Sequence, residues 1–201
     1  MIESFLLNTL IFSIILLPLI GASFISLFIK NTSIKEIQFF SLFFSFFTFI
    51  ISLFLWVFFD NSIFNFQFIE ILSWLPNSNI NCFIGIDGIS LFFILLVTLL
   101  CPICILSSFE VINKNFKEYI ILFLIMESFL IIIFSILDLI IFYIFFESVL
   151  IPMFLIIGIW GSRKRKIRSN YMFFLYTLFG SVLMLIAILF VYFTKGTTDY
   201  Q

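Results

Sequence analysis

Six long apolar runs, separated by short polar stretches, make up most of the chain. They predict helices over about residues 5–29, 36–59, 88–108, 118–137, 139–160 and 170–194. Each run is close to the roughly 20 apolar residues that a helix needs to cross the hydrocarbon layer of a membrane. The apolar residues are continuous and do not alternate with polar ones, which favours helices over the strands of a membrane barrel. The predicted fold class is therefore an all-α integral membrane protein with about six transmembrane helices.

The stretch between the second and third helices, about residues 60–85, has a different pattern. Every second residue from Phe64 to Phe68 is Phe, and the residues between them are polar. A second apolar run at 80–84 follows the turn-forming residues 76–79. This pattern predicts a short extramembrane β-hairpin between helices 2 and 3. Asp87 comes next and is expected to cap the third helix, because its carboxylate can accept hydrogen bonds from the free amides of the first turn.

The composition agrees with a lipid environment and argues against several classes of function. Hydrophobic residues make up 64% of the 201 residues and charged residues 10%, too few polar groups to cover a water-soluble globule. The net charge of -1 gives no reason to expect nucleic acid as a partner. The chain has no His, so we expect no haem, zinc or other cofactor in it. Cys101 and Cys104 have the spacing of a redox pair, but they lie inside an apolar run and are interpreted as packing residues.

The basic residues predict how the helices are oriented in the membrane. With six helices, nine of the ten Lys and Arg residues fall in the first, third and fifth loops, and only Lys195 falls on the other side. Loops on the cytoplasmic or matrix side collect Lys and Arg, which puts the N-terminus on the outer, positive side. Five of the nine lie at residues 163–168. We interpret this cluster as a topogenic signal, with a lipid-headgroup patch or a docking surface as the alternatives.

Three carboxylates lie within the predicted helices or between them. Glu147 is near the middle of the fifth helix, Glu127 is midway along the fourth, and Asp138 is at the junction of the two. An ionisable group at the centre of a membrane helix costs ~2.5–3.5 kcal/mol on insertion scales, so such groups usually face protein or water and serve transport. Depth therefore ranks Glu147 first as a candidate for proton transfer.

The surroundings of Glu147 suit that role. Burial favours the proton-bearing form of an acid and a nearby lysine favours the ionised form, so a carboxyl group between these influences can take up and release a proton. Pro152 lacks the amide that would bond the carbonyl of Ser148, which leaves an acceptor for water beside Glu147. The alternative is a Glu that is held by a neighbouring helix and has no function in transport.

The other acids are weaker candidates. Glu127 is explained equally well as a packing hydrogen bond between helices and as a member of a proton relay. Asp138 lies almost half a turn round the helix from Glu147, so the two do not share a face. A cap, or a charge at the mouth of a path, is the expected role of Asp138. Glu110 and Glu118 are interpreted as ordinary loop charges.

Several segments have a recognisable sequence, and the one around Glu147, Phe-Phe-Glu-Ser-Val-Leu-Ile-Pro, is the most specific. The segments are Gly85 to Phe93, Pro102 to Leu106, Asp138 to Met153, Trp160 with Gly161, and Phe173 to Met184. Together they resemble the antiporter-like membrane subunits of respiratory complex I, the NADH:ubiquinone oxidoreductase, in their mitochondrial form.

The resemblance implies a proton pump in which a Glu on the fifth helix pairs with a Lys on a broken seventh helix. Glu147 takes the place of that Glu, and Glu110 is similar in position to another acid of the family. Residues 1–108 would then be three N-terminal helices with an outer-side hairpin, and residues 109–201 the first, incomplete part of the antiporter-like repeat. Family members continue for more than twice this length, so we expect a second polypeptide from a split gene to supply the remaining helices and the Lys. A truncated product is the alternative.

The resemblance also implies where the chain works and with what. Other membrane-arm subunits of complex I and membrane lipids are the expected partners, with NADH, FMN, iron–sulfur clusters and ubiquinone bound in other subunits. The expected location is the mitochondrial inner membrane, with the N-terminus facing the intermembrane space. The 34 Phe residues, with abundant Ile and Asn, fit an A+T-rich, organelle-encoded gene. The expected function is proton translocation coupled to electron transfer; the alternatives are a structural membrane-arm subunit and a free-standing cation/proton antiporter.

Overall fold

The computed structural model describes residues 2–31, 33–62, 65–75, 80–112, 114–162 and 165–198, with the backbone alone for residues 2–8, 71–75 and 80–81. Six helices in this part of the chain are long and apolar enough to cross a membrane, and a small two-stranded sheet lies between the second and third, which confirms the predicted fold class. The helices are α1 (Ile2–Phe28), α2 (Ile34–Phe58), α3 (Gly88–Val111), α4 (Phe116–Ser135), α5 (Leu139–Trp160) and α6 (Lys166–Lys195).

The helix ends differ from the predicted ones by a few residues, and at α4 the reason is a tertiary contact. The apolar run predicts a helix to residue 137, but α4 ends at Ser135. Ile136 forms a β-bridge with Ile84 of the hairpin, and the amide of Leu137 donates a hydrogen bond to the carbonyl of Phe83 (2.8 Å). The hairpin therefore takes over backbone groups that the helix would otherwise use.

The predicted hairpin is confirmed, although its first strand begins later than the Phe alternation indicates. Strand β1 (Gln67–Leu75) pairs antiparallel with β2 (Ile80–Ile86), and the turn residues 76–79 lie outside the described residues. Phe68 has a φ of 57°, and the register shifts between Gln67 and Glu70. An extra residue of this kind bends a strand and increases its twist. The alternation thus identified the region of the hairpin but not its register.

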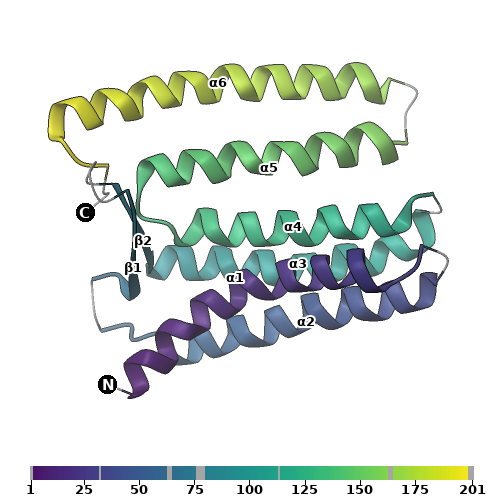
Figure 1. The fold of residues 1–201 in the computed structure, drawn as a ribbon, viewed down its shortest axis with the longest axis horizontal. Helices are drawn as coiled ribbons and strands as arrows, with labels where there is room; N and C mark the ends of the chain where they lie inside the picture. The colour runs from purple at the N-terminus through teal and green to yellow at the C-terminus, as the bar shows by residue number, and fades with distance from the viewer. Residues whose placement is uncertain are drawn as a thin grey trace.

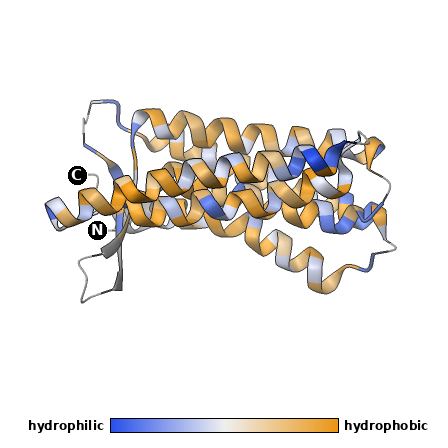
Figure 2. Ribbon diagram, turned by 90° about the horizontal axis from the view of Figure 1, so that it is seen from above, coloured by the Kyte–Doolittle hydropathy of each residue, from blue (hydrophilic) through white to orange (hydrophobic). Residues whose placement is uncertain are grey.

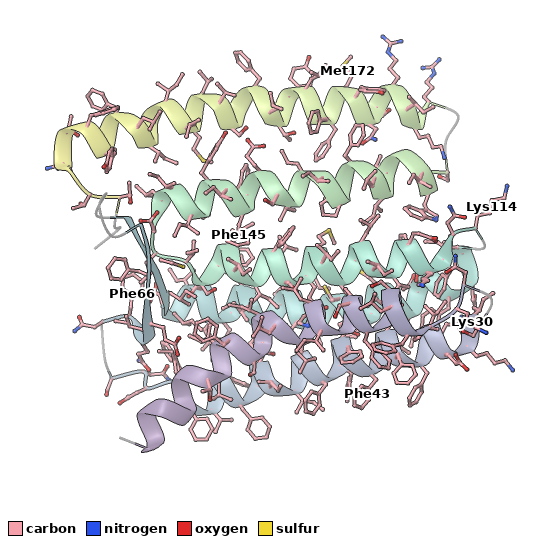
Figure 3. The ribbon with its side chains drawn as sticks, in the orientation of Figure 1. Lys30, Phe43, Phe66, Lys114, Phe145 and Met172 are labelled. Carbon is pink, nitrogen blue, oxygen red and sulfur yellow. The ribbon has the colours of Figure 1, made fainter. Side chains whose placement is uncertain are left out.

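All six helices run along the long axis of the molecule, and the hairpin lies across one end (Figure 1). We call this end, where α1 begins and α6 finishes, the hairpin end, and the opposite end the basic end. Lys30 and Lys114 both lie at the basic end (Figure 3), whereas Lys195 closes α6 at the hairpin end. This arrangement agrees with the predicted alternation of basic loops. Which side of the membrane each end faces stays a prediction.

Helices α1 and α4 are the most buried, whereas few residues of α5 and α6 are buried. Helix α6 forms one edge of the molecule, beside α5 (Figure 1). Most of the helical residues visible in Figure 2 are hydrophobic, so hydropathy alone does not separate a lipid-facing side from a protein-facing one. The core at the hairpin end includes Ile11, Leu55, Ile86, Leu91 and Ile131, and the core at the basic end includes Ile25, Ile37, Ile105, Ile120 and Leu124.

Side chains satisfy the free backbone groups at two helix ends. At the start of α3, the carboxylate of Asp87 accepts a hydrogen bond from the amide of Gly88 (2.6 Å), and the Asp87 amide donates to the hydroxyl of Ser90 (2.7 Å). The predicted cap is therefore confirmed as part of a capping box. After α1, the ammonium group of Lys117 donates to the carbonyls of Ser26 (2.9 Å) and Ile29 (2.8 Å). These bonds tie the start of α4 to the end of α1.

Candidate functional site

Glu147 lies in the ninth position of the 22-residue helix α5 and is partly buried. Its Oε1 is buried and has no hydrogen-bond partner among the described residues. The phenol of Tyr143, one turn earlier on the same helix, interacts with the Glu147 carboxyl group and with the hydroxyl of Ser181 on α6. Glu147 therefore belongs to a cluster of polar side chains between α5 and α6, and one of its oxygens is without a hydrogen bond.

Sequence reasoning missed Tyr143 and Ser181. The spacing of four residues between Tyr143 and Glu147 places them on one face of a helix, and this signal could have identified the tyrosine. No such signal exists for Ser181, because its position depends on how α6 packs against α5.

Helices α1 to α6 bring no lysine near Glu147. The lysines of these helices, Lys35, Lys117, Lys166 and Lys195, all lie in a first or last turn. A cation that meets the free oxygen of Glu147 in the middle of the membrane would have to come from a part of the protein beyond these six helices.

Glu127 lies midway along α4 and is completely buried. Its Oε1 is 2.9 Å from the hydroxyl of Thr48 on α2, and its Oε2 has no hydrogen-bond partner among the described residues. The thiol of Cys101 on α3 is close enough to interact with Glu127 electrostatically. The structure therefore shows the interhelical contact that the sequence offered as one of two explanations.

Asp138 is the N-cap of α5 and is 1% exposed. Its Oδ1 accepts hydrogen bonds from the amides of Ile140 (2.9 Å) and Ile141 (3.1 Å), and its Oδ2 accepts one from the hydroxyl of Thr198 (2.5 Å). The amide of Leu139 donates to the carbonyl of Thr198 (3.0 Å). The expected capping role is thus present, and the same carboxylate also fixes the segment that follows α6.

A cavity of about 460 Å³ opens beside Asp138 at the hairpin end. It lies between the start of α3, the α4–α5 junction and the hairpin, and its polar lining residues are Asp87, Ser90 and Asp138. Both oxygens of Asp138 already accept hydrogen bonds from the chain. Burial, and secondly the nearby charge of Asp138, raise the pKa of the Cys82 thiol on β2. The cavity therefore has acidic groups at its wall, but the best placed of them is engaged in holding the fold.

The remaining charged candidates lie at the basic end. Glu110 is exposed in the last turn of α3, where the sequence predicted a loop. Of the cluster at 163–168, Arg163 and Lys164 lie outside the described residues, and the ammonium group of Lys166 donates to the carbonyl of Ile159 near the end of α5 (2.6 Å). The roles proposed for the cluster are not tested by this contact.

The structure does not bring the candidate acids together. Glu127 points to α2 and α3, Glu147 interacts with α5 and α6, and Asp138 lies at the hairpin end. Glu110 lies at the opposite end of the bundle from Asp138. The acids therefore do not form one cluster, and any role in proton transfer belongs to each acid separately.

The chain is similar to known proteins over most of its length. Residues 137–201 match the family model described as NADH:quinone oxidoreductase/Mrp antiporter, TM. Over 188 residues, 94% of the chain, the sequence is 58% identical to NADH-ubiquinone oxidoreductase chain 4 of Marchantia polymorpha and 57% identical to that of Arabidopsis thaliana. The predicted resemblance to the antiporter-like subunits of complex I is confirmed.

The fold is shared with one chain of a solved complex I structure. A chain of respiratory complex I from Thermus thermophilus with bound NADH matches 94% of this chain with a TM-score of 0.80 and 26% identity. The chain spans 38% of the length of the two chain 4 relatives and 37% of the Thermus chain. Glu147 lies within the part that the family model matches.

Proposed function

We propose that this chain is part of a proton-translocating membrane-arm subunit of respiratory complex I, and that Glu147 takes up and releases the translocated proton. The observation that carries the proposal is the free oxygen of Glu147: its carboxyl group lies in the middle of a membrane helix, and Oε1 has no hydrogen-bond partner among the described residues. Intramembrane acids are costly and generally serve transport. Its setting is also the segment most specific to the antiporter-like family.

The chemistry follows from two states of one carboxyl group. An acid in apolar surroundings is neutral unless a cation lies nearby, and approach of a cation favours release of its proton. The resemblance implies that a lysine from a seventh helix is this cation. Few residues of α5 and α6 are buried, so this side of the bundle has room for further helices.

Two neighbours support a path for the proton. Tyr143 and Ser181 are hydroxyl groups that can hand a proton on or hold a water molecule beside Glu147. Pro152 leaves the carbonyl of Ser148 without its usual helical amide. Glu110 and Asp138 are kept as candidates for the ends of the path, with Asp138 acting mainly through the fold.

The surroundings of the chain are part of the same proposal. Other membrane-arm subunits and lipids are the partners, the lysine that the resemblance implies lies beyond helices α1 to α6, and NADH, FMN, iron–sulfur clusters and ubiquinone bind elsewhere in the complex. Loops that face the matrix collect Lys and Arg, and Lys30 and Lys114 lie at the basic end. The chain therefore spans the mitochondrial inner membrane with the basic end toward the matrix and the hairpin end toward the intermembrane space. Residues 1–108 and 109–201 form its two parts, the second being the start of the antiporter-like repeat.

The decisive experiment measures protons pumped per NADH oxidised by the purified complex in liposomes. Glu147→Gln keeps the size of the side chain and removes its titration, so we expect pumping to fall relative to electron transfer, while Glu147→Asp retains part of it. Glu118→Gln, which changes an exposed acid in the first turn of α4, is the matched control. A wild-type ratio in Glu147→Gln would favour a structural subunit instead.

A mass-spectrometric inventory of the same preparation tests the partners. We expect complex I subunits, together with peptides from the further antiporter-like helices that carry the lysine. A preparation without complex I subunits would favour the free-standing antiporter.

A further inference from the structure

A row of hydroxyl side chains lines the side of α2 that faces α3 and α4. Ser41, Ser45, Thr48 and Ser52 follow one another at helical spacing, and none of them is exposed. Ser52 lies 2.8 Å from the hydroxyl of Thr98 on α3. Small hydroxyl residues often do no more than pack membrane helices closely, so this row is not a site by itself. The observation that points to a ligand is the free, buried Oε2 of Glu127, the acid that meets this row at Thr48.

Counting hydrogens shows which way the contact between Thr48 and Glu127 is directed. The Thr48 hydroxyl has one hydrogen and lies near two oxygens, the Ser45 carbonyl at 2.6 Å and Glu127 Oε1 at 2.9 Å. The carbonyl can only accept, and it is the nearer of the two. If the Thr48 hydroxyl donates its hydrogen bond to the Ser45 carbonyl, a hydrogen bond between Thr48 and Oε1 needs a hydrogen from Glu127. Only a protonated carboxyl group can supply it.

The charge balance leads to the same state. Burying an ionised carboxylate costs on the order of several kcal/mol, and only a paired cation with further hydrogen bonds offsets this cost. No Lys or Arg of the described chain forms an ion pair with Glu127, and the titratable group that faces it from α3 is the thiol of Cys101, which brings no positive charge. Glu127 is therefore held as a neutral acid between α2, α3 and α4.

We propose that Glu127 is a second proton-binding residue of this chain, separate from Glu147. At rest Glu127 keeps its proton, donates a hydrogen bond with it to the hydroxyl oxygen of Thr48, and binds one buried water molecule through Oε2. A buried acceptor without a partner costs about 1–3 kcal/mol, and buried polar atoms are rarely left so. Water is the smallest donor that can fill the position. The proposal does not depend on proton pumping through Glu147.

Infrared spectroscopy of the purified complex, in ordinary and heavy water at neutral pH, tests the proton. We expect a carboxylic-acid C=O band that is lost in Glu127→Gln, moves in Thr48→Val and stays in Ser41→Ala. Ser41 is the matched control because it is a fully buried hydroxyl of the same row whose bond goes to the carbonyl of Gln38 in its own helix. The band should also persist in Glu147→Gln, which separates this proposal from the proposed function.

Each part of the proposal can fail on its own result. No band lost in Glu127→Gln would show that the resting acid is ionised, and an unmoved band in Thr48→Val would show that Thr48 is not the acceptor. If Glu127→Gln does not assemble, Glu127→Asp keeps an acid and should move the band without deleting it. A cryo-EM map that resolves water should show density within hydrogen-bond distance of Oε2; a protein atom in that position would overturn the water site.

Discussion

Removing the Asp138 carboxylate should loosen the start of α5 and the segment after α6 together. Asp138→Ala deletes the acceptor for the amides of Ile140 and Ile141 and leaves the buried hydroxyl of Thr198 without its partner. Loss of an N-cap costs about 0.5–2 kcal/mol. Since about 1.4 kcal/mol is a factor of ten, amide exchange in the first turn of α5 should become about 2- to 30-fold faster if it occurs by local opening.

Hydrogen–deuterium exchange with mass spectrometry on the purified complex can measure this rate. Asp138→Asn keeps an oxygen for the two amides, so its first turn should exchange more slowly than that of Asp138→Ala. Asp87→Ala is the matched control, because Asp87 caps α3 and should change exchange there and not in α5. Unchanged exchange at the start of α5 in Asp138→Ala would refute the cap as the source of its stability.

Two further predictions concern packing and thiol reactivity. Gly21→Ala would place a Cβ 2.7 Å from the ring of Phe44 on α2, so it should lower the stability of the complex by about 1–3 kcal/mol in thermal unfolding. Gly180→Ala is the control, because a Cβ there meets nothing within 4 Å and should not lower the stability. An equal loss of stability in both variants would contradict the contact between Gly21 and Phe44. The raised pKa of Cys82 leaves less thiolate at a given pH, so its alkylation should be slower than that of an ordinary thiol and become faster in Asp138→Asn. A rate that is independent of Asp138 would rule out this electrostatic effect.

The six helices could be predicted because length and apolarity are properties of a continuous run of sequence. The ends of those helices could not, as α4 shows: the apolar run continues through Leu137, but the hairpin binds the Leu137 amide and the helix stops at Ser135. The register of β1 was missed for a similar reason, since the bulge at Phe68 changes which residues pair. Local pattern thus predicts the elements, and tertiary hydrogen bonds decide their limits.

The sequence alone identified the candidate acids, but it did not identify the side chains that contact them. Depth in an apolar run identified Glu147 and Glu127 without any structure. Pairing Glu127 with Thr48, 79 positions earlier, or Asp138 with Thr198, 60 positions later, requires knowledge of which helices are neighbours. The hydroxyl row of α2 was visible in the sequence as Ser and Thr at helical spacing, and could have identified the buried side of that helix.

Polar positions are the better guide to buried surfaces in this chain, for a physical reason. Lipid and protein interior are equally apolar, so an apolar side chain gains little from choosing one over the other, whereas a hydroxyl or amide needs a protein partner. Helix α6 shows this clearly, because Asn170 and Ser181 are two of its three buried residues and the third is Ile188. The amide of Asn170 donates to the carbonyl of Phe154 on α5 (2.7 Å).

The two membrane acids each keep one free oxygen, but they differ in what can reach it. Glu127 is enclosed by α2, α3 and α4, so only a donor as small as water completes its hydrogen bonds. The free Oε1 of Glu147 is buried too, but Glu147 lies on α5, which has few buried residues, so another part of the protein can pack beside it and supply a partner. The effect of changing Glu147 should therefore depend on that neighbour, whereas the protonation of Glu127 should be set within these helices. A double variant of Glu147 and the lysine that we propose as its partner should therefore leave the Glu127 acid band in place.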